Sequence, residues 1–153
     1  MLVDATQDFE DLLTLLGQHE VRYLIVGGLA FVYHAKPRYT KDMNLWIEPA
    51  APNLELANRA LAEFGSPTLL SLDDPGEIVQ IGVAPNRVNL LQKLEDASFD
   101  DAWRARIVDR YSNVQANWIG LDDLLAVKEK IDAPRHQEDA RVLREVKRLR
   151  GDL

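Results

Sequence analysis

The 153-residue sequence contains no cysteine, and only two methionines and three histidines are present. Without cysteine the chain can form neither disulfides nor zinc sites with thiolate ligands. Long apolar runs are also missing, so we expect no membrane span. The first residues lack the basic segment and apolar stretch of a signal peptide, which leads us to expect a cytoplasmic protein. The net charge of -7 argues against general binding to nucleic acid, because phosphate neutralisation needs a surplus of Lys and Arg.

The length and the 46% hydrophobic content are typical of one domain with a substantial core. No internal repeat, low-complexity segment or linker divides the chain. We expect a single domain over residues 1–153, in which residues 21–119 form the sheet and its helices. Residues 120–150 are expected to form a helical C-terminal cap.

Hydrophobic periodicity and turn residues predict the elements of the first half. Four apolar residues at helical spacing indicate an N-terminal helix that ends near Gly17. The pattern then predicts a buried strand over 22–26, a helix over 29–34, a strand over 42–48, and a helix from Asn53, its expected N-cap, to about Phe64.

In the second half, the residues Asp-Asp-Pro-Gly at 73–76 form a strong turn signal. The pattern after it predicts a hairpin of strands 77–83 and 87–91, a short helix over 99–103 capped by Ser98, a strand over 114–119, and helices over 121–131 and 137–149.

Three short polar side chains are expected to meet on one face of the sheet. The strand over 42–48 alternates, so Asp42 and Asn44 share the face opposite the buried apolar residues. In the strand over 87–91 the apolar neighbours of Asn89 would be buried, which turns Asn89 toward the face that carries Asp42. Such a cluster is typical of a polar site at a sheet surface.

A glycine pair precedes this cluster. Thirteen residues lie between Gly27-Gly28 and Asp42, and the pair stands at a predicted strand-to-helix turn. Glycines at a helix start let the backbone approach a phosphate group closely and offer it their N–H groups. Acidic residues at positions i and i+2 of a strand would project together and could hold divalent ions. Here the second position is Asn44.

Four segments together resemble the small bacterial nucleotidyltransferase-fold proteins of the DNA polymerase beta type superfamily. They are YLIVGGLAFVYHAKPRYTKDMNLWIE, RVNLL, FDDAW and LDDLLAVKEKIDAPRHQEDARVL, and the resemblance spans about Val21 to Leu143. That group includes nucleotidyltransferase-like partners and toxins of toxin-antitoxin systems. The resemblance implies an α/β (α+β) nucleotidyltransferase fold, with a small mixed sheet flanked by helices and a helical C-terminal cap.

The resemblance also assigns roles to residues. It implies that the catalytic positions are Asp42, Asn44 and Asn89, of which Asp42 and Asn44 would be the metal ligands for Mg²⁺. It implies a nucleoside triphosphate bound by a wider set of residues. These are Gly27, Gly28, Arg38, Thr40, Lys41 and Lys128, and the basic-acidic cluster of the family falls on Lys128, Arg135 and Asp139.

The sequence departs from the family pattern at two of the three metal-site positions. The pattern has Asp where this chain has Asn44 and Asn89. Asparagine loses the charge and is a poorer ligand for a hard cation, and Asn89 cannot act as a general base. We therefore expect Mg²⁺ binding to be weak or lost and nucleotidyl transfer to be impaired or absent. The chain would then be either a degenerate member of this group or a chain with deliberate inactivating substitutions.

Structural alternatives apply to the same residues. Asn44 and Asn89 could serve as hydrogen-bonded groups that join neighbouring strands. Arg38 and Lys41 could be exposed loop cations, and Lys128 could belong to a solvated helix face.

The aromatic and histidine residues also allow simpler interpretations. Trp46 is expected in core packing, although it shares the face of Asp42 and could stack on a base. Histidines 19, 34 and 136 lack metal-ligand spacing and are interpreted as structural.

Three functions follow from these features. The first is an enzyme that transfers a nucleotidyl group from a nucleoside triphosphate to a hydroxyl of a protein, RNA or small molecule. The second is a non-catalytic relative that binds nucleotide or regulates a partner, either a companion protein or a second copy of itself. The third is a nucleic-acid-binding module that uses the basic C-terminal helix, for which salt-sensitive binding is the test.

Overall fold

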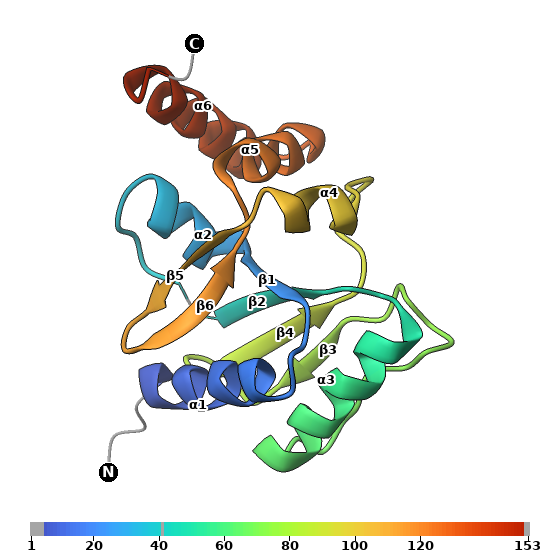
Figure 1. Ribbon diagram of the computed structural model, residues 1–153. Coiled ribbons are helices and arrows are strands. Elements are labelled where there is room, and N and C mark those ends of the chain that lie inside the picture. Colours follow the sequence, from blue (N-terminus) through green and yellow to red (C-terminus); the bar gives the residue numbers. More distant parts are fainter. Residues whose placement is uncertain (1–4, 41, 152–153) are drawn as a thin grey trace.

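The computed structural model describes residues 5–40 and 42–151 (Figure 1). Lys41, one of the expected nucleotide-binding residues, lies outside them. The helices are α1 (Ala5–Gln18), α2 (Gly27–His34), α3 (Ala51–Phe64), α4 (Phe99–Arg104), α5 (Leu121–Lys130) and α6 (Pro134–Leu149). The strands are β1 (Tyr23–Val26), β2 (Asp42–Ile47), β3 (Val79–Ile81), β4 (Arg87–Leu91), β5 (Ile107–Tyr111) and β6 (Val114–Trp118).

The strands form one mixed sheet with the order β3-β4-β2-β1-β6-β5. At its centre, β2 pairs antiparallel with β1 and parallel with β4. β1 also pairs parallel with β6, and the antiparallel hairpins β3-β4 and β5-β6 complete the two sides. The expected small mixed sheet flanked by helices is confirmed.

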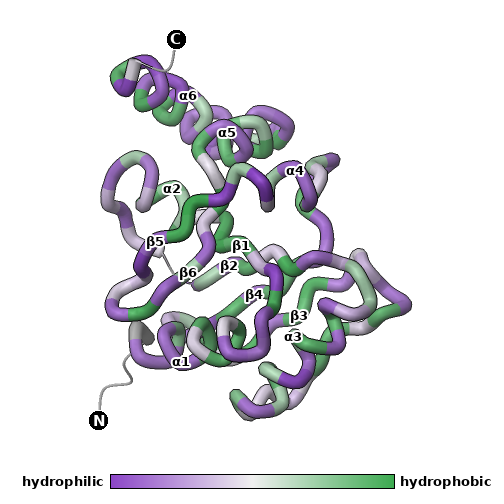
Figure 2. The backbone as a smooth tube through the Cα atoms, viewed as in Figure 1, coloured by the Kyte–Doolittle hydropathy of each residue, from purple (hydrophilic) through white to green (hydrophobic). Residues whose placement is uncertain are grey.

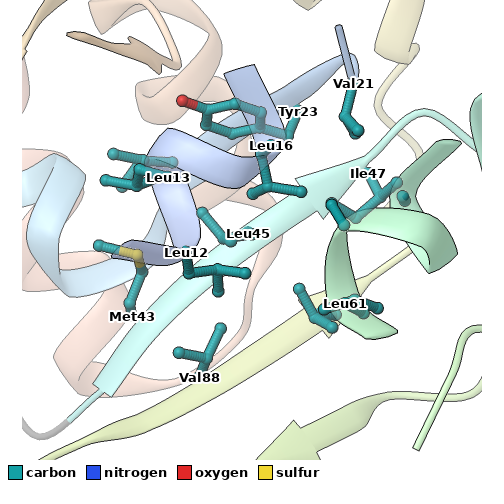
Figure 3. Packing of buried hydrophobic residues seen from close by; sticks show 14 of the residues in the cluster. Leu12, Leu13, Leu16, Val21, Tyr23, Met43, Leu45, Ile47, Leu61 and Val88 are labelled. Carbon is teal, nitrogen blue, oxygen red and sulfur yellow. The ribbon is translucent and has the colours of Figure 1, made fainter. Parts of the chain in front are cut away.

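Helices cover both faces of the sheet, and each face has its own hydrophobic core (Figure 1). On one face, α1 and α3 pack against alternate residues of the central strands, as Figure 3 shows for the leucines of α1 around Leu45. The leucine spacing that predicted α1 is the buried stripe, since Leu12, Leu13 and Leu16 are at most 1% exposed. This core fixes the position of β2.

The second core lies on the opposite face, beneath α2, α4, α5 and α6. Trp46 belongs to it. Its ring meets Phe99 edge-on at 5.1 Å, and only 1% of the residue is exposed. Stacking of Trp46 on a base is therefore wrong, and its packing role is the one found.

The C-terminal cap consists of α5 and α6, which pack on each other and on α2. In Figure 2 both helices carry hydrophobic and hydrophilic stretches in alternation, as expected for helices with one buried face. α6 begins at Pro134, three residues before the predicted start, because proline suits the first turn of a helix, where its missing N–H is not needed. Within the described ranges, no helix is both long and apolar enough to cross a membrane.

Two predicted details are wrong and one strand is missing from the prediction, each for an identifiable reason. Asn53 does not cap α3, whose N-cap is Ala50. Instead the buried Asn53 amide accepts from the Arg22 N–H at 2.8 Å and donates to the carbonyls of Arg22 and Glu48 at 3.0 Å. It thereby ties α3 to the sheet.

The other two differences concern strands. β3 covers only three residues of the predicted range 77–83, and it ends at Ile81, directly before Gly82, which has a φ of +76°. β5 was not predicted, because its three central residues are exposed and its sequence IVDRY lacks apolar alternation.

Candidate functional site

A cleft of about 470 Å³ opens where β1 ends and β2 begins. The amino end of α2, the segment before β2, the start of β4 and the two C-terminal helices surround it. Its lining residues are Gly27, Gly28, Arg38, Tyr39, Thr40, Asp42, Asn44, Arg87, Lys128, Arg135 and His136. Most of the residues implied by the resemblance are therefore brought together.

The glycine pair forms the first residues of α2. Gly27 has a φ of +69°, and a Cβ there would lie 2.6 Å from Nδ2 of Asn44. A Cβ on Gly28 would lie 3.0 Å from the Thr40 methyl group. Gly27 therefore needs the small residue, whereas a side chain at Gly28 would require the Thr40 methyl group to shift by a few tenths of an ångström.

The amino end of α2 faces the cleft without a side-chain cap from the described residues, and its N-cap is Val26. The first N–H groups of a helix have no partner within the helix, and together with the helix dipole they favour an anion. This end of α2 is thus suited to a phosphate group.

The three expected polar residues do meet, and they are hydrogen-bonded to one another. β2 and β4 run parallel in a register that places Asn44 beside Asn89. The Asn89 Nδ2 group donates to Oδ2 of Asp42 at 2.8 Å and to Oδ1 of Asn44 at 2.9 Å. Asn89 is 8% exposed, so these bonds are largely shielded from water. The amide nitrogen of Asn89 thus joins one oxygen of Asp42 to the side-chain oxygen of Asn44.

Arg87 adds a cation to this group, and the sequence interpretation missed it. Its Nε and Nη2 atoms lie 3.3 and 3.2 Å from Oδ2 of Asp42, the residue beside it in the β2-β4 register. Arg87 and Asn89 are two residues apart on one strand, so they share a face. That spacing was the signal that could have identified Arg87.

These donors do not fit a Mg²⁺ site. Mg²⁺ requires oxygen ligands at about 2.0–2.1 Å in near-octahedral geometry and favours carboxylates. Among the three residues only Asp42 has a carboxylate, and one of its oxygens accepts bonds from Asn89 and Arg87. Throughout the described residues, no group of three or more His, Cys, Asp or Glu is arranged to hold a metal ion.

A second charged cluster forms another wall of the cleft. Asp139 of α6 accepts from Arg38 at 2.7 and 3.1 Å and pairs with Nζ of Lys128 at 3.0 Å. The Asp139 and Lys128 side chains are each 5% exposed, and the Arg38 guanidinium lies over the Phe31 ring at 4.2 Å. Lys128 is therefore a buried, paired residue, and the alternative of a solvated helix face is wrong for it.

Burial and charge set the protonation of this wall. Burial by itself would raise the pKa of Asp139, but the hydrogen bonds from Arg38 and Lys128 outweigh it and hold the pKa below its usual value. Burial lowers the pKa of Lys128, opposed by the bond with Asp139.

His136 completes the wall at the edge of the cleft. Burial and then the charge of Lys128 lower the pKa of His136. Nζ of Lys128 lies 3.1 Å from Nδ1 of His136. An ammonium group can only donate, so His136 accepts at Nδ1 and is neutral.

The cleft is electropositive in a chain whose net charge is -7. Four basic side chains line it, from Arg38, Arg87, Lys128 and Arg135. The carboxylates that face them are Asp42 in the cleft and Asp139 behind it, which leaves a positive balance. A local positive field inside an acidic surface attracts and selects anionic ligands.

A larger hollow of about 870 Å³ lies at the other end of β1, between α1 and the β5-β6 hairpin. The guanidinium groups of Arg22 and Arg106 lie over the Trp103 ring at 5.6 and 3.8 Å. None of the expected site residues lines this hollow. The smaller cleft at Gly27 is therefore the candidate site.

No protein-family profile matches the sequence, and no curated protein matches it. Solved structures do share its fold. ANT(2")-Ia in complex with adenylyl-2"-tobramycin aligns with a TM-score of 0.62 at 14% identity, over 96% of this chain and 95% of that one.

Two further structures agree. A Thermotoga maritima protein classed provisionally as a nucleotidyltransferase has a TM-score of 0.60 at 15% identity, over 91% of this chain and 89% of its own. The lincosamide antibiotic adenylyltransferase LnuA with lincomycin bound has a TM-score of 0.60 at 13% identity, over 92% and 96%. The chain described here has the nucleotidyltransferase fold.

Proposed function

We propose that this chain is a nucleotidyltransferase-like protein that binds a nucleoside triphosphate in the cleft at Gly27, with nucleotidyl transfer impaired or absent. The observation that carries the proposal is the hydrogen-bonded set Asp42–Asn89–Asn44 inside an electropositive cleft. The cleft keeps the features that bind phosphate, while the carboxylates that would support transfer are reduced to one.

The phosphate side of the proposal rests on backbone and charge. The amino end of α2 and the glycine pair suit a phosphate group, and Arg38, Lys128 and Arg135 line the same cleft. Two of the fold neighbours involve adenylyl groups: ANT(2")-Ia is in complex with adenylyl-2"-tobramycin, and LnuA is an adenylyltransferase. An adenine nucleotide is therefore the first ligand to test.

Impaired transfer follows from the chemistry of the amide groups. Nucleotidyl transfer develops negative charge on the phosphate and needs a base to accept the proton of the attacking hydroxyl. An amide carries no charge and cannot accept that proton, so neither Asn44 nor Asn89 supplies these functions. Asp42 is the one carboxylate left, and it is already engaged by Arg87.

The basic final helix gives less support to the nucleic-acid alternative. Its exposed arginines pair with acids of the same helix or of α5, as in Arg141 with Glu138, Arg144 with Glu129 and Arg148 with Glu145. The cations of α6 thus alternate with acids, which weakens their attraction for nucleic acid. We therefore place phosphate binding in the cleft, which four basic side chains line.

The test is a calorimetric titration of ATP, GTP, CTP and UTP into the wild-type chain and into the double variant Asn44→Asp plus Asn89→Asp, with product release followed in parallel. We expect wild-type binding without turnover, and metal-dependent turnover by the double variant. A matched control, Asn113→Asp plus Gln115→Glu, adds two negative charges at exposed positions away from the cleft. It should behave like wild type. Absence of binding by every chain would refute the proposal.

A further inference from the structure

We infer that the cleft binds the triphosphate group without a divalent metal ion, with the guanidinium of Arg87 and the amide of Asn89 taking over the roles of that ion. This inference rests on the proposed function, since it concerns how the same cleft holds its nucleotide.

A metal ion in such a site has two roles, and the first is to bring oxygen ligands from neighbouring strands together. In this chain the Nδ2 group of Asn89 does so, at 2.8 Å from Asp42 and 2.9 Å from Asn44. Both contacts are donor-to-acceptor bonds, so the oxygens are held close without mutual repulsion. The Nδ2 group of Asn89 therefore joins the three side chains without an ion, while the buried Oδ1 of Asn89 has no hydrogen-bond partner among the described residues.

The second role of the ion is to present positive charge to the phosphate, and Arg87 has the position for it. Its two contacts reach the same oxygen of Asp42. A guanidinium has five N–H donors in a planar fork, so donors remain for a second anion. The Arg87 side chain is 33% exposed and lines the cleft, so a phosphate can reach it.

The surrounding charge also works against a metal ion. An ion at Asp42 would lie beside Arg87, within a few ångströms of like charge, in a cleft that also contains Arg38, Lys128 and Arg135. By contrast, a metal-free triphosphate carries two more negative charges than its Mg²⁺ complex. The electropositive cleft therefore favours the metal-free form.

The first measurement compares ATP binding by the wild-type chain in excess EDTA and in excess Mg²⁺. We expect binding in EDTA that is at least as tight as in Mg²⁺. Binding that requires Mg²⁺ would overturn this inference and leave the proposed function standing. Absence of binding in both conditions would overturn the proposed function itself.

The second measurement tests Arg87 with variants that change one charge. Arg87→Gln should weaken binding in EDTA by about tenfold or more, because a charge-assisted bond to phosphate is lost. The matched control Arg59→Gln makes the same change on the exposed face of α3 and should alter binding less than twofold. Equal binding by wild type and Arg87→Gln in EDTA would overturn the role of Arg87.

Two further variants test whether the fork of Arg87 and the amide donor of Asn89 act in ligand binding or only support the fold. Arg87→Lys keeps the charge but loses the fork, and it should bind between wild type and Arg87→Gln. Asn89→Asp replaces the bridging donor by a carboxylate, and its ATP binding should become stronger in Mg²⁺ than in EDTA. Unchanged metal dependence in folded Asn89→Asp, checked by thermal melting, would contradict the inference.

Discussion

Asp139→Asn tests whether the charged wall of the cleft also holds the C-terminal cap in place. The substitution keeps the shape of the side chain but removes the charge that neutralises Lys128 and Arg38. Because the Asp139 and Lys128 side chains are each 5% exposed, the lysine would be left buried beside a neutral amide. Removing one partner of a buried ion pair lowers the free energy of unfolding by about 3–5 kcal/mol. Because the Arg38 side chain is 23% exposed, we expect a loss near the lower value of this range.

The assay is urea and thermal unfolding of the wild type and the variant. A loss of about 3 kcal/mol lowers Tm by about 6–12 °C in a domain of this size. The control is Glu138→Gln, which removes the same charge from the adjacent, exposed residue and should leave the midpoint nearly unchanged. A loss below about 1 kcal/mol for Asp139→Asn would refute the reasoning that the pair is effectively buried.

The pH dependence of the same comparison provides a second check. The pKa of Asp139 is held below its usual 3.8, so the folded state keeps the carboxylate charged to lower pH than the unfolded state does. The stability that Asp139 contributes is therefore fully present above about pH 4 and is lost as the pH falls below 3.8. The difference between wild type and variant should stay constant near neutral pH and shrink in acid.

The remaining predictions concern single residues. Gly27→Ala should destabilise the fold by about 2 kcal/mol or more in urea unfolding, because φ is +69° and the new Cβ would lie 2.6 Å from Asn44. The control is Gly17→Ala in α1, where a Cβ would have nothing within 4 Å, and this variant should be neutral or stabilising. Burial and the charge of Lys128 should keep the pKa of His136 below 6.5, which an NMR titration of the histidines measures. A pKa above 6.5 would contradict the contact between Lys128 and Nδ1 of His136. Burial raises the pKa of Tyr23 to about 12, so stability should fall between about pH 10 and 12 by up to about 1.4 kcal/mol per pH unit relative to Tyr23→Phe.

Local periodicity accounts for the part of the site that could be predicted. Alternation along two strands placed Asp42, Asn44 and Asn89 on one face, and the parallel register of β2 and β4 joins them as expected. The same alternation placed Trp46 on that face, but it could not show that α4 covers the ring with Phe99. Side-chain direction is a local property of a strand, whereas accessibility depends on what packs above it.

The contacts that depend on tertiary packing could not be predicted. The pairing of Lys128 with Asp139 depends on how α5 and α6 dock, and the bond from Arg38 joins residues 101 positions apart. The Asn53 side chain illustrates the same limit, because its tertiary hydrogen bonds replace the capping role that its local sequence indicates. The contact of Arg87 with Asp42 required the register between two strands that are distant in sequence.

The bond between Arg38 and Asp139 also orders events during synthesis. The sheet around β1 and β2 and the start of α2 belong to the first third of the chain, whereas Asp139 lies in the last helix. A ribosome therefore releases the glycine end of the cleft before α6, which carries Asp139 and the cleft residues Arg135 and His136. A nascent chain that has not yet docked α6 has no complete cleft, so the arrangement proposed to bind nucleotide exists only once the last helix is in place.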